Sequence, residues 1–111
     1  EILSRVNFFD NKAYVGIREA DCEEFGVQIG DSESIVNMLR DLKGVEVACI
    51  LKEYGPKEYK VSLRSKDYVD VSEIARANGG GGHIRASGFS IEKDTFEEAE
   101  KTLLKILEGI D

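Results

Sequence analysis

The chain has 111 residues, 41% hydrophobic and 33% charged, a balance typical of one globular domain with a core of its own. Its net charge of −7 argues against indiscriminate binding to long nucleic acids, which depends on a broad basic surface. No run approaches the roughly 20 apolar residues that a membrane-spanning helix needs, so no membrane partner is expected.

The two cysteines, Cys22 and Cys49, have no metal-binding spacing. Cys49 stands in an apolar run and is expected to be a reduced core residue, which favours a cytoplasmic location. Because the chain begins at Glu1 and not at methionine, we expect it to be part of a longer protein.

Periodicity and turn signals predict an α/β domain, a mixed sheet of about five strands with helices packed against it. In chain order, the expected elements are strands over 4–9 and 13–18, helices over 20–25 and 31–43, strands over 45–53 and 58–66, a helix over 71–78, a strand over 86–91 and a helix from 94 to the C-terminus.

Details of these elements follow from single residues. Met38 is expected in the buried stripe of the helix over 31–43. The sequence Asp70-Val71-Ser72-Glu73 has the form of a capping box, so Asp70 begins the next helix. Asp94 is the expected cap of the last helix, whose apolar residues recur every three or four positions.

Alternation along 58–66 decides which side chains share a face. Tyr59, Val61, Leu63 and Ser65 are predicted on one face, and Lys60, Ser62, Arg64 and Lys66 on the other. Spacing alone favours an ordinary exposed strand face over a binding surface.

The most unusual stretch is Gly79-Gly80-Gly81-Gly82-His83-Ile84-Arg85. Consecutive glycines leave backbone N–H groups accessible, and successive N–H groups in a turn can bind an anion. His83 and Arg85 add donors that suit phosphate oxygens. A flexible connection is the alternative, although the run lacks the serine and proline typical of linkers. Neither a Walker A loop nor the dinucleotide fingerprint fits it.

The distribution of charge supports an anion-binding role for the glycine run only in part. Between Lys57 and Arg85 there are six basic and four acidic residues, so a positive island in an acidic chain coincides with the glycine run. One histidine, and no cluster of histidine with carboxylates, predicts neither a catalytic residue nor a metal site in this chain.

The stretch from Gly79 to Gly88 resembles the G-G-G-G-H-x-x-A-[AS]-G signature of the DHH-associated domain, the C-terminal substrate-binding domain of DHH-family phosphoesterases. Residues 61–66 and 69–75 resemble the same family at the expected order and spacing. The similarity extends over most of the chain from Ser32 onward, and is closest to the oligoribonuclease and 3′-phosphoadenosine 5′-phosphate phosphatase branch.

The resemblance implies that catalysis and substrate binding lie in two different domains. An upstream DHH domain of the same chain would hold two divalent metals, manganese or magnesium, and hydrolyse a short oligoribonucleotide or nucleotide. The present chain, 1–111, would bind the substrate, have no cofactor of its own and be inactive alone. A homodimer is among the expected partners. The implied substrate contacts are Arg64, Ser65, Gly79, Gly80, Gly81, Gly82, His83 and Arg85.

Three alternatives stay open at this point. The domain could serve a cyclic-dinucleotide phosphodiesterase, or be a non-catalytic RNA-binding module of the kind that ends alanyl-tRNA synthetases. It could also be a plain interaction domain whose glycine run is a hinge.

Overall fold

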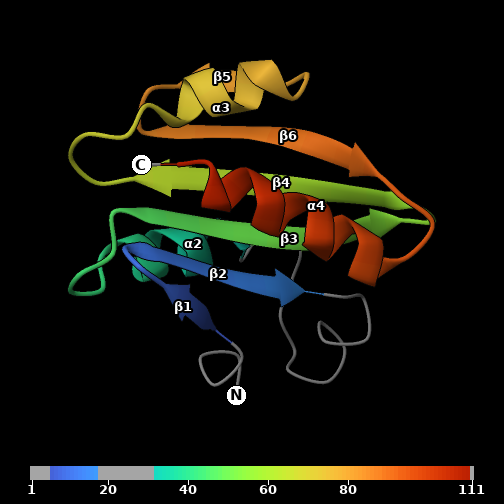
Figure 1. Cartoon of the computed structure of the whole chain (residues 1–111), viewed down its shortest axis with the longest axis horizontal. Coiled ribbons are helices and arrows are strands. Elements are labelled where there is room, and N and C mark those ends of the chain that lie inside the picture. The colour runs from blue at the N-terminus through green and yellow to red at the C-terminus, as the bar shows by residue number, and fades with distance from the viewer. Residues whose placement is uncertain (1–5, 18–31, 111) are drawn as a thin grey trace.

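The computed structural model describes residues 6–17 and 32–110. Within them the chain forms, in order, β1 (Asn7–Phe9), β2 (Lys12–Ile17), α2 (Ser32–Arg40), β3 (Val47–Gly55), β4 (Glu58–Ser65), α3 (Val71–Ala77), β5 (Gly81–His83), β6 (Ala86–Glu92) and α4 (Phe96–Glu108) (Figure 1). The predicted α/β class is confirmed. The helix expected over 20–25, and Cys22, lie outside the described residues.

The strands form one mixed sheet of six strands in the order β1-β2-β3-β4-β6-β5. Only β2 and β3 pair in parallel; every other neighbouring pair is antiparallel. The sheet therefore has one strand more than the expected five, because β5 is a short edge strand that no sequence pattern indicated.

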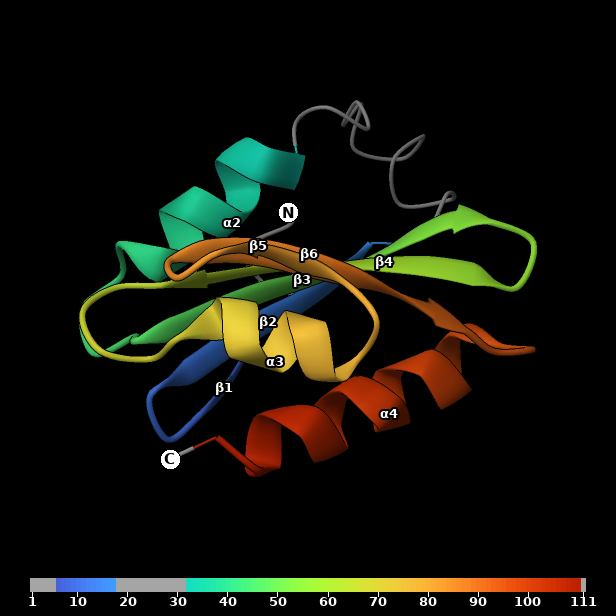
Figure 2. The same cartoon turned by 90° about the horizontal axis from the view of Figure 1, so that it is seen from above.

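Helices cover the two faces of the sheet unequally. Figure 2 shows α2 on one side of the sheet and α3 and α4 on the other. Val36 and Leu39 of α2, both fully buried, pack with the inward residues of β2 and β3. The opposite face carries the larger core, to which α4 contributes Ala99, Leu103 and Leu107 and in which Cys49 lies buried, as predicted. Residues of β4 and β6 on the α2 side instead line an open hollow.

Two details of the helices differ from the prediction. Thr95, and not Asp94, begins α4, since its side chain accepts a hydrogen bond from the amide of Glu98. Met38 is 42% exposed, because α2 turns only a narrow stripe toward the sheet. Asp70 begins α3 as predicted and accepts from the amides of Ser72 and Glu73.

None of the helices within residues 6–17 and 32–110 combines the length and the hydrophobicity needed to cross a bilayer.

Candidate functional site

The register of the last three strands brings distant residues into one row. His83 on β5 lies opposite Ala86 on β6, and Ala86 lies opposite Arg64 on β4. Directly opposed residues of antiparallel strands project to the same face. His83 and Arg64 therefore stand on the same side of the sheet, roughly 10 Å apart across three strands.

Two further rows continue this surface along the strands. In the next row, Gly81 lies opposite Gly88, which lies opposite Ser62. In the row after that, Ser90 lies opposite Lys60. We call this surface the shelf; it consists of Lys60, Ser62, Arg64, Gly81, His83, Ala86, Gly88 and Ser90.

The shelf has a floor of small residues with basic side chains at its margin. Its floor contains a hollow of about 460 Å³ whose lining includes Lys60, Ser62, Gly81, Gly88 and Ser90 as well as residues 78–80. The predicted alternation of β4 is confirmed here, because Tyr59, Val61 and Leu63 are buried on the opposite face. Backbone and hydroxyl groups beside positive side chains suit an anionic ligand.

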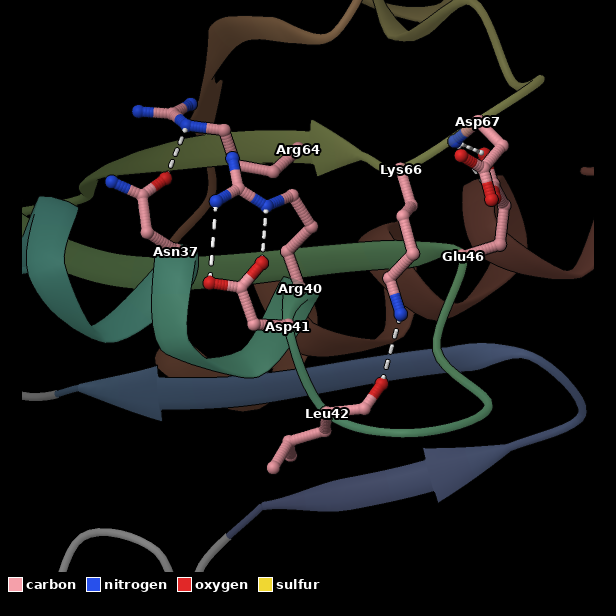
Figure 3. A network of polar contacts seen from close by, with 8 residues as sticks. All are labelled: Asn37, Arg40, Asp41, Leu42, Glu46, Arg64, Lys66 and Asp67. Carbon is pink, nitrogen blue, oxygen red and sulfur yellow. Dashed lines mark hydrogen bonds and ion pairs between the residues drawn. The ribbon is translucent and has the colours of Figure 1, made fainter.

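Arg64 is oriented by helix α2. Its Nε donates to Oδ1 of Asn37 at 3.2 Å, and its Nη1 donates to the carbonyl of Leu63 at 2.9 Å. In Figure 3 the guanidinium group extends past Asn37, with its terminal nitrogens directed away from that side chain. Asn37 was not among the residues predicted from the sequence, since nothing in its spacing links it to β4.

The first two glycines of the run are required by the fold. Gly79 has φ of +87°, the left-handed conformation that commonly follows a helix, and its amide donates to the carbonyl of Arg76. The amide of Gly80 donates to the carbonyl of Ala75 at 2.7 Å. A Cβ at Gly80 would lie 2.1 Å from the carbonyl oxygen of Gly88, so only glycine fits against β6. These two amides are therefore bound by the chain itself, contrary to the expectation of four accessible N–H groups.

The next two glycines belong to strand β5 and differ in their surroundings. A Cβ at Gly82, whose φ is +146°, would lie 2.6 Å from Cα of Ser87, so the fold also requires this glycine. Gly81 has no such constraint: a Cβ there would meet nothing within 4 Å. Nothing in the fold of the described residues explains a glycine at position 81, which lines the hollow of the shelf.

The turn that carries His83 is anchored on both sides. The carbonyl of Ile84 accepts from the amide of Val71 at 2.9 Å, and the carbonyl of Arg85 accepts from the amide of Ser65 at 3.1 Å. His83 itself is exposed at the end of β5. The imidazole is thus presented to solvent from an anchored backbone.

Two of the predicted contact residues do not reach the shelf. Ser65 is only 2% exposed on the opposite face of β4, and its Oγ donates to the carbonyl of Val69 at 2.6 Å. The guanidinium of Arg85 donates to the carbonyls of Asp67 and Val69 and to Oγ of Ser65. In the structure both side chains therefore brace the segment between β4 and α3.

Glu46 holds the same segment from the other side. This residue is 5% exposed, and its carboxylate accepts hydrogen bonds from the amides of Asp67, Tyr68 and Val69 at 2.9–3.1 Å. Figure 3 shows the contact with Asp67. Burial raises the pKa of Glu46, but the backbone hydrogen bonds outweigh burial, so the pKa lies below its usual value. Glu46 was not among the residues predicted from the sequence, although an acidic residue between two valines at the start of an apolar strand was a usable signal.

Another hollow, of about 400 Å³, lies between α3 and the C-terminal end of α4. Its lining includes Asp70 and Glu73 but no basic residue, so it does not suit a phosphate. Nor do the described residues bring three or more His, Cys, Asp or Glu side chains together, so they do not fit a divalent metal site.

Comparison with known proteins identifies the family of the domain. The DHHA1 domain model matches residues 10–109. The chain is 31% identical over 103 residues to the bifunctional oligoribonuclease and PAP phosphatase NrnA of Bacillus subtilis, covering 92% of this chain and 32% of that protein. It is 32% identical over 75 residues to NrnA of Thermus thermophilus, covering 68% of this chain and 23% of that protein. The chain thus spans a third or less of these relatives.

Solved structures share the fold. An exopolyphosphatase-related protein from Bacteroides fragilis has a TM-score of 0.83 at 33% identity, over 96% of this chain and 32% of that one. The C-Ala domain of alanyl-tRNA synthetase from Aquifex aeolicus has a TM-score of 0.63 at 22% identity, over 94% of this chain and 98% of that one. At that identity the second likeness is one of fold alone.

Proposed function

Because the chain belongs to the DHHA1 domain family, we propose that it is the substrate-binding domain of a DHH phosphoesterase and that the shelf binds a phosphate of a short oligoribonucleotide or nucleotide. The observation that carries the proposal is the row His83, Ala86 and Arg64, which sets an imidazole and a guanidinium on one face beside a glycine floor.

Three residues of the shelf have separate roles. Arg64 is a permanently charged donor, and Asn37 fixes its direction. His83 supplies a second donor from an anchored turn. Gly81 keeps the floor free of side-chain atoms, so a phosphate or ribose can approach the backbone of β5 closely.

The other predicted contacts support the shelf indirectly. Gly79, Gly80 and Gly82 set the path of the backbone from α3 into β5. Ser65 and Arg85 hold the segment that joins β4 to α3, and thereby fix both ends of the row. We assign direct contact to Arg64, Gly81 and His83, and a positioning role to the other five residues.

Hydrolysis is assigned to a second domain. The described residues offer no cluster of three or more His, Cys, Asp or Glu side chains that could hold a metal ion. A DHH domain upstream in the same protein, carrying manganese or magnesium, would cut the substrate that the shelf positions. Holding a reacting group in place can lower a barrier by several kcal/mol, about 7 or more in favourable cases. The chain by itself is expected to bind and not to hydrolyse.

The names of the relatives support the choice of substrate, since the NrnA proteins are named for acting on oligoribonucleotides and on PAP. The Listeria monocytogenes protein PdeA, 28% identical over 87 residues, is named a cyclic-di-AMP phosphodiesterase, so a cyclic dinucleotide is the second candidate ligand.

Calorimetric titration of the 111-residue chain with adenosine 5′-monophosphate, cyclic di-AMP and tRNA tests the proposal. Saturable binding of the mononucleotide should be lost in folded Arg64→Ala and His83→Ala variants. Lys101→Ala removes a positive charge on α4, away from the shelf, and should bind normally. Preference for cyclic di-AMP or for tRNA would favour the corresponding alternative, and no binding of any ligand would favour a plain interaction domain.

A further inference from the structure

The shelf has a second positive end, which the row of Arg64 and His83 does not use. Lys60 lies on the same face of β4, four residues from Arg64, because side chains two and four residues apart in a strand share a face. Four residues of strand span about 13 Å. Lys60 lines the hollow of the shelf, as does Gly81, whose row lies next to the row of His83 and Arg64; Arg64 and His83 themselves stand outside that lining.

The ammonium of Lys60 is held away from Arg64. Its Nζ lies 4.1 Å from the centroid of the Tyr54 ring, a cation–π contact. Tyr54 lies at the end of β3, where the register with β4 shifts near Gly55. It follows Lys52, the partner of Lys60, on the side away from Arg64, so the Tyr54 ring draws the ammonium away from Arg64. The contact therefore keeps two positive groups at opposite ends of the shelf.

Neighbouring groups complete this second end. Ser90 lies directly opposite Lys60, is exposed, and can donate its hydroxyl to the same ligand. A smaller hollow of about 220 Å³ continues beyond Lys60 and Ser90; Tyr54, which is 51% exposed, lines it together with Glu58 and Glu92.

The surface changes sign immediately after this end. Glu58 lies opposite Glu92 in the next row of β4 and β6, and both are exposed. Two opposed carboxylates repel a phosphate, so an anionic ligand that follows the shelf is not favoured beyond Lys60. The positive surface thus has a defined length.

From these contacts we propose that Lys60 and Ser90 form a second phosphate subsite, so that the shelf binds two phosphates of one linear oligonucleotide, one at each end. One phosphate group is too small to contact both ends, and a mononucleotide 5′-phosphate fills only the end at Arg64 and His83. The second subsite rests on the proposed function and adds a preference for length. Tyr54 is a positioning residue for Lys60.

The test compares pA with pApApA, both 5′-phosphorylated, in calorimetric titrations of the 111-residue chain at fixed salt. We expect pApApA to bind about tenfold more tightly than pA, and Lys60→Ala to remove about fivefold of that advantage, with a smaller loss of affinity for pA. Lys101→Ala, which removes the same charge from α4, should keep the full advantage. Thermal unfolding checks that both variants are folded.

The outcomes separate the two claims. Equal affinity for pA and pApApA, or a Lys60→Ala effect that is the same for both ligands, overturns the second subsite and leaves the proposed function intact. Absence of pA binding, or pA binding that Arg64→Ala and His83→Ala do not weaken, overturns the proposed function and the subsite with it.

Discussion

The glycine run offers a test in which stability and binding respond in opposite ways. Gly80 and Gly81 are adjacent, yet a Cβ at Gly80 would lie 2.1 Å from a backbone oxygen and 2.8 Å from Cα of Phe89, whereas a Cβ at Gly81 would meet nothing within 4 Å. Alanine at position 80 must therefore displace strand β6, and alanine at position 81 need not displace anything.

The expected magnitudes follow from these distances. Overpacking against backbone costs about 1–3 kcal/mol or more, so Gly80→Ala should lower the melting temperature by roughly 4–12 °C. Gly81→Ala should leave stability unchanged or raise it by about 0.4–1 kcal/mol, because alanine reduces the entropy of the unfolded chain. Its methyl group would stand in the hollow of the shelf, so its affinity for pA should fall about tenfold or more.

Urea unfolding measures the stability of the Gly80→Ala and Gly81→Ala variants, and calorimetric titration with pA measures their affinity. Gly82→Ala, with its clash at Ser87, serves as a second destabilised control. A Gly81→Ala variant as unstable as Gly80→Ala would contradict the assigned surroundings of Gly81, and a stable Gly81→Ala variant that binds pA as well as the original chain would contradict its role in the shelf.

Three further predictions concern residues around the shelf. Glu46→Gln should lower the free energy of unfolding by about 1–3 kcal/mol at pH 7. Because folding lowers the pKa of Glu46, the carboxylate stabilises the fold fully above the unfolded pKa near 4.3, and this stabilisation is lost as pH falls through the folded pKa. The urea unfolding curves of the variant and the original chain should therefore converge in acid, and a difference in stability that does not change with pH would contradict this account. Asn37→Ala should weaken pA binding about three- to tenfold in the original chain, but should have no further effect on pA binding in the Arg64→Ala variant. Additive effects of the two substitutions in this double-mutant cycle would show that Asn37 acts independently of Arg64. Ser65→Ala should cost about 1–3 kcal/mol of stability with little change in pA affinity, and the reverse pattern would restore a direct contact for Ser65.

Local signals predicted much of the fold. The helix cap at Asp70, the apolar run that contains Cys49 and the alternation along 58–66 each rest on residues close in sequence, and each is confirmed. Thr95 and Asp94 are both good caps, so composition alone could not choose between them.

The site was harder to predict because it depends on register. Arg64 and His83 are nineteen residues apart, and only the pairing of β4 with β6 and of β6 with β5 sets them in one row. β5 itself contains two glycines and a histidine, which have no strand pattern. Ser65 was assigned by motif alone; its parity in β4 turns it toward the core.

NMR chemical-shift mapping of the 111-residue chain with pA tests the central claim most directly. The largest shifts should fall on the amides of Gly81, His83, Gly88 and Arg64, which lie on three strands and come together only on the shelf. Shifts centred instead on Tyr68, Ile74 and Ile110, around the hollow between α3 and α4, would contradict the assignment of the shelf as the phosphate-binding surface.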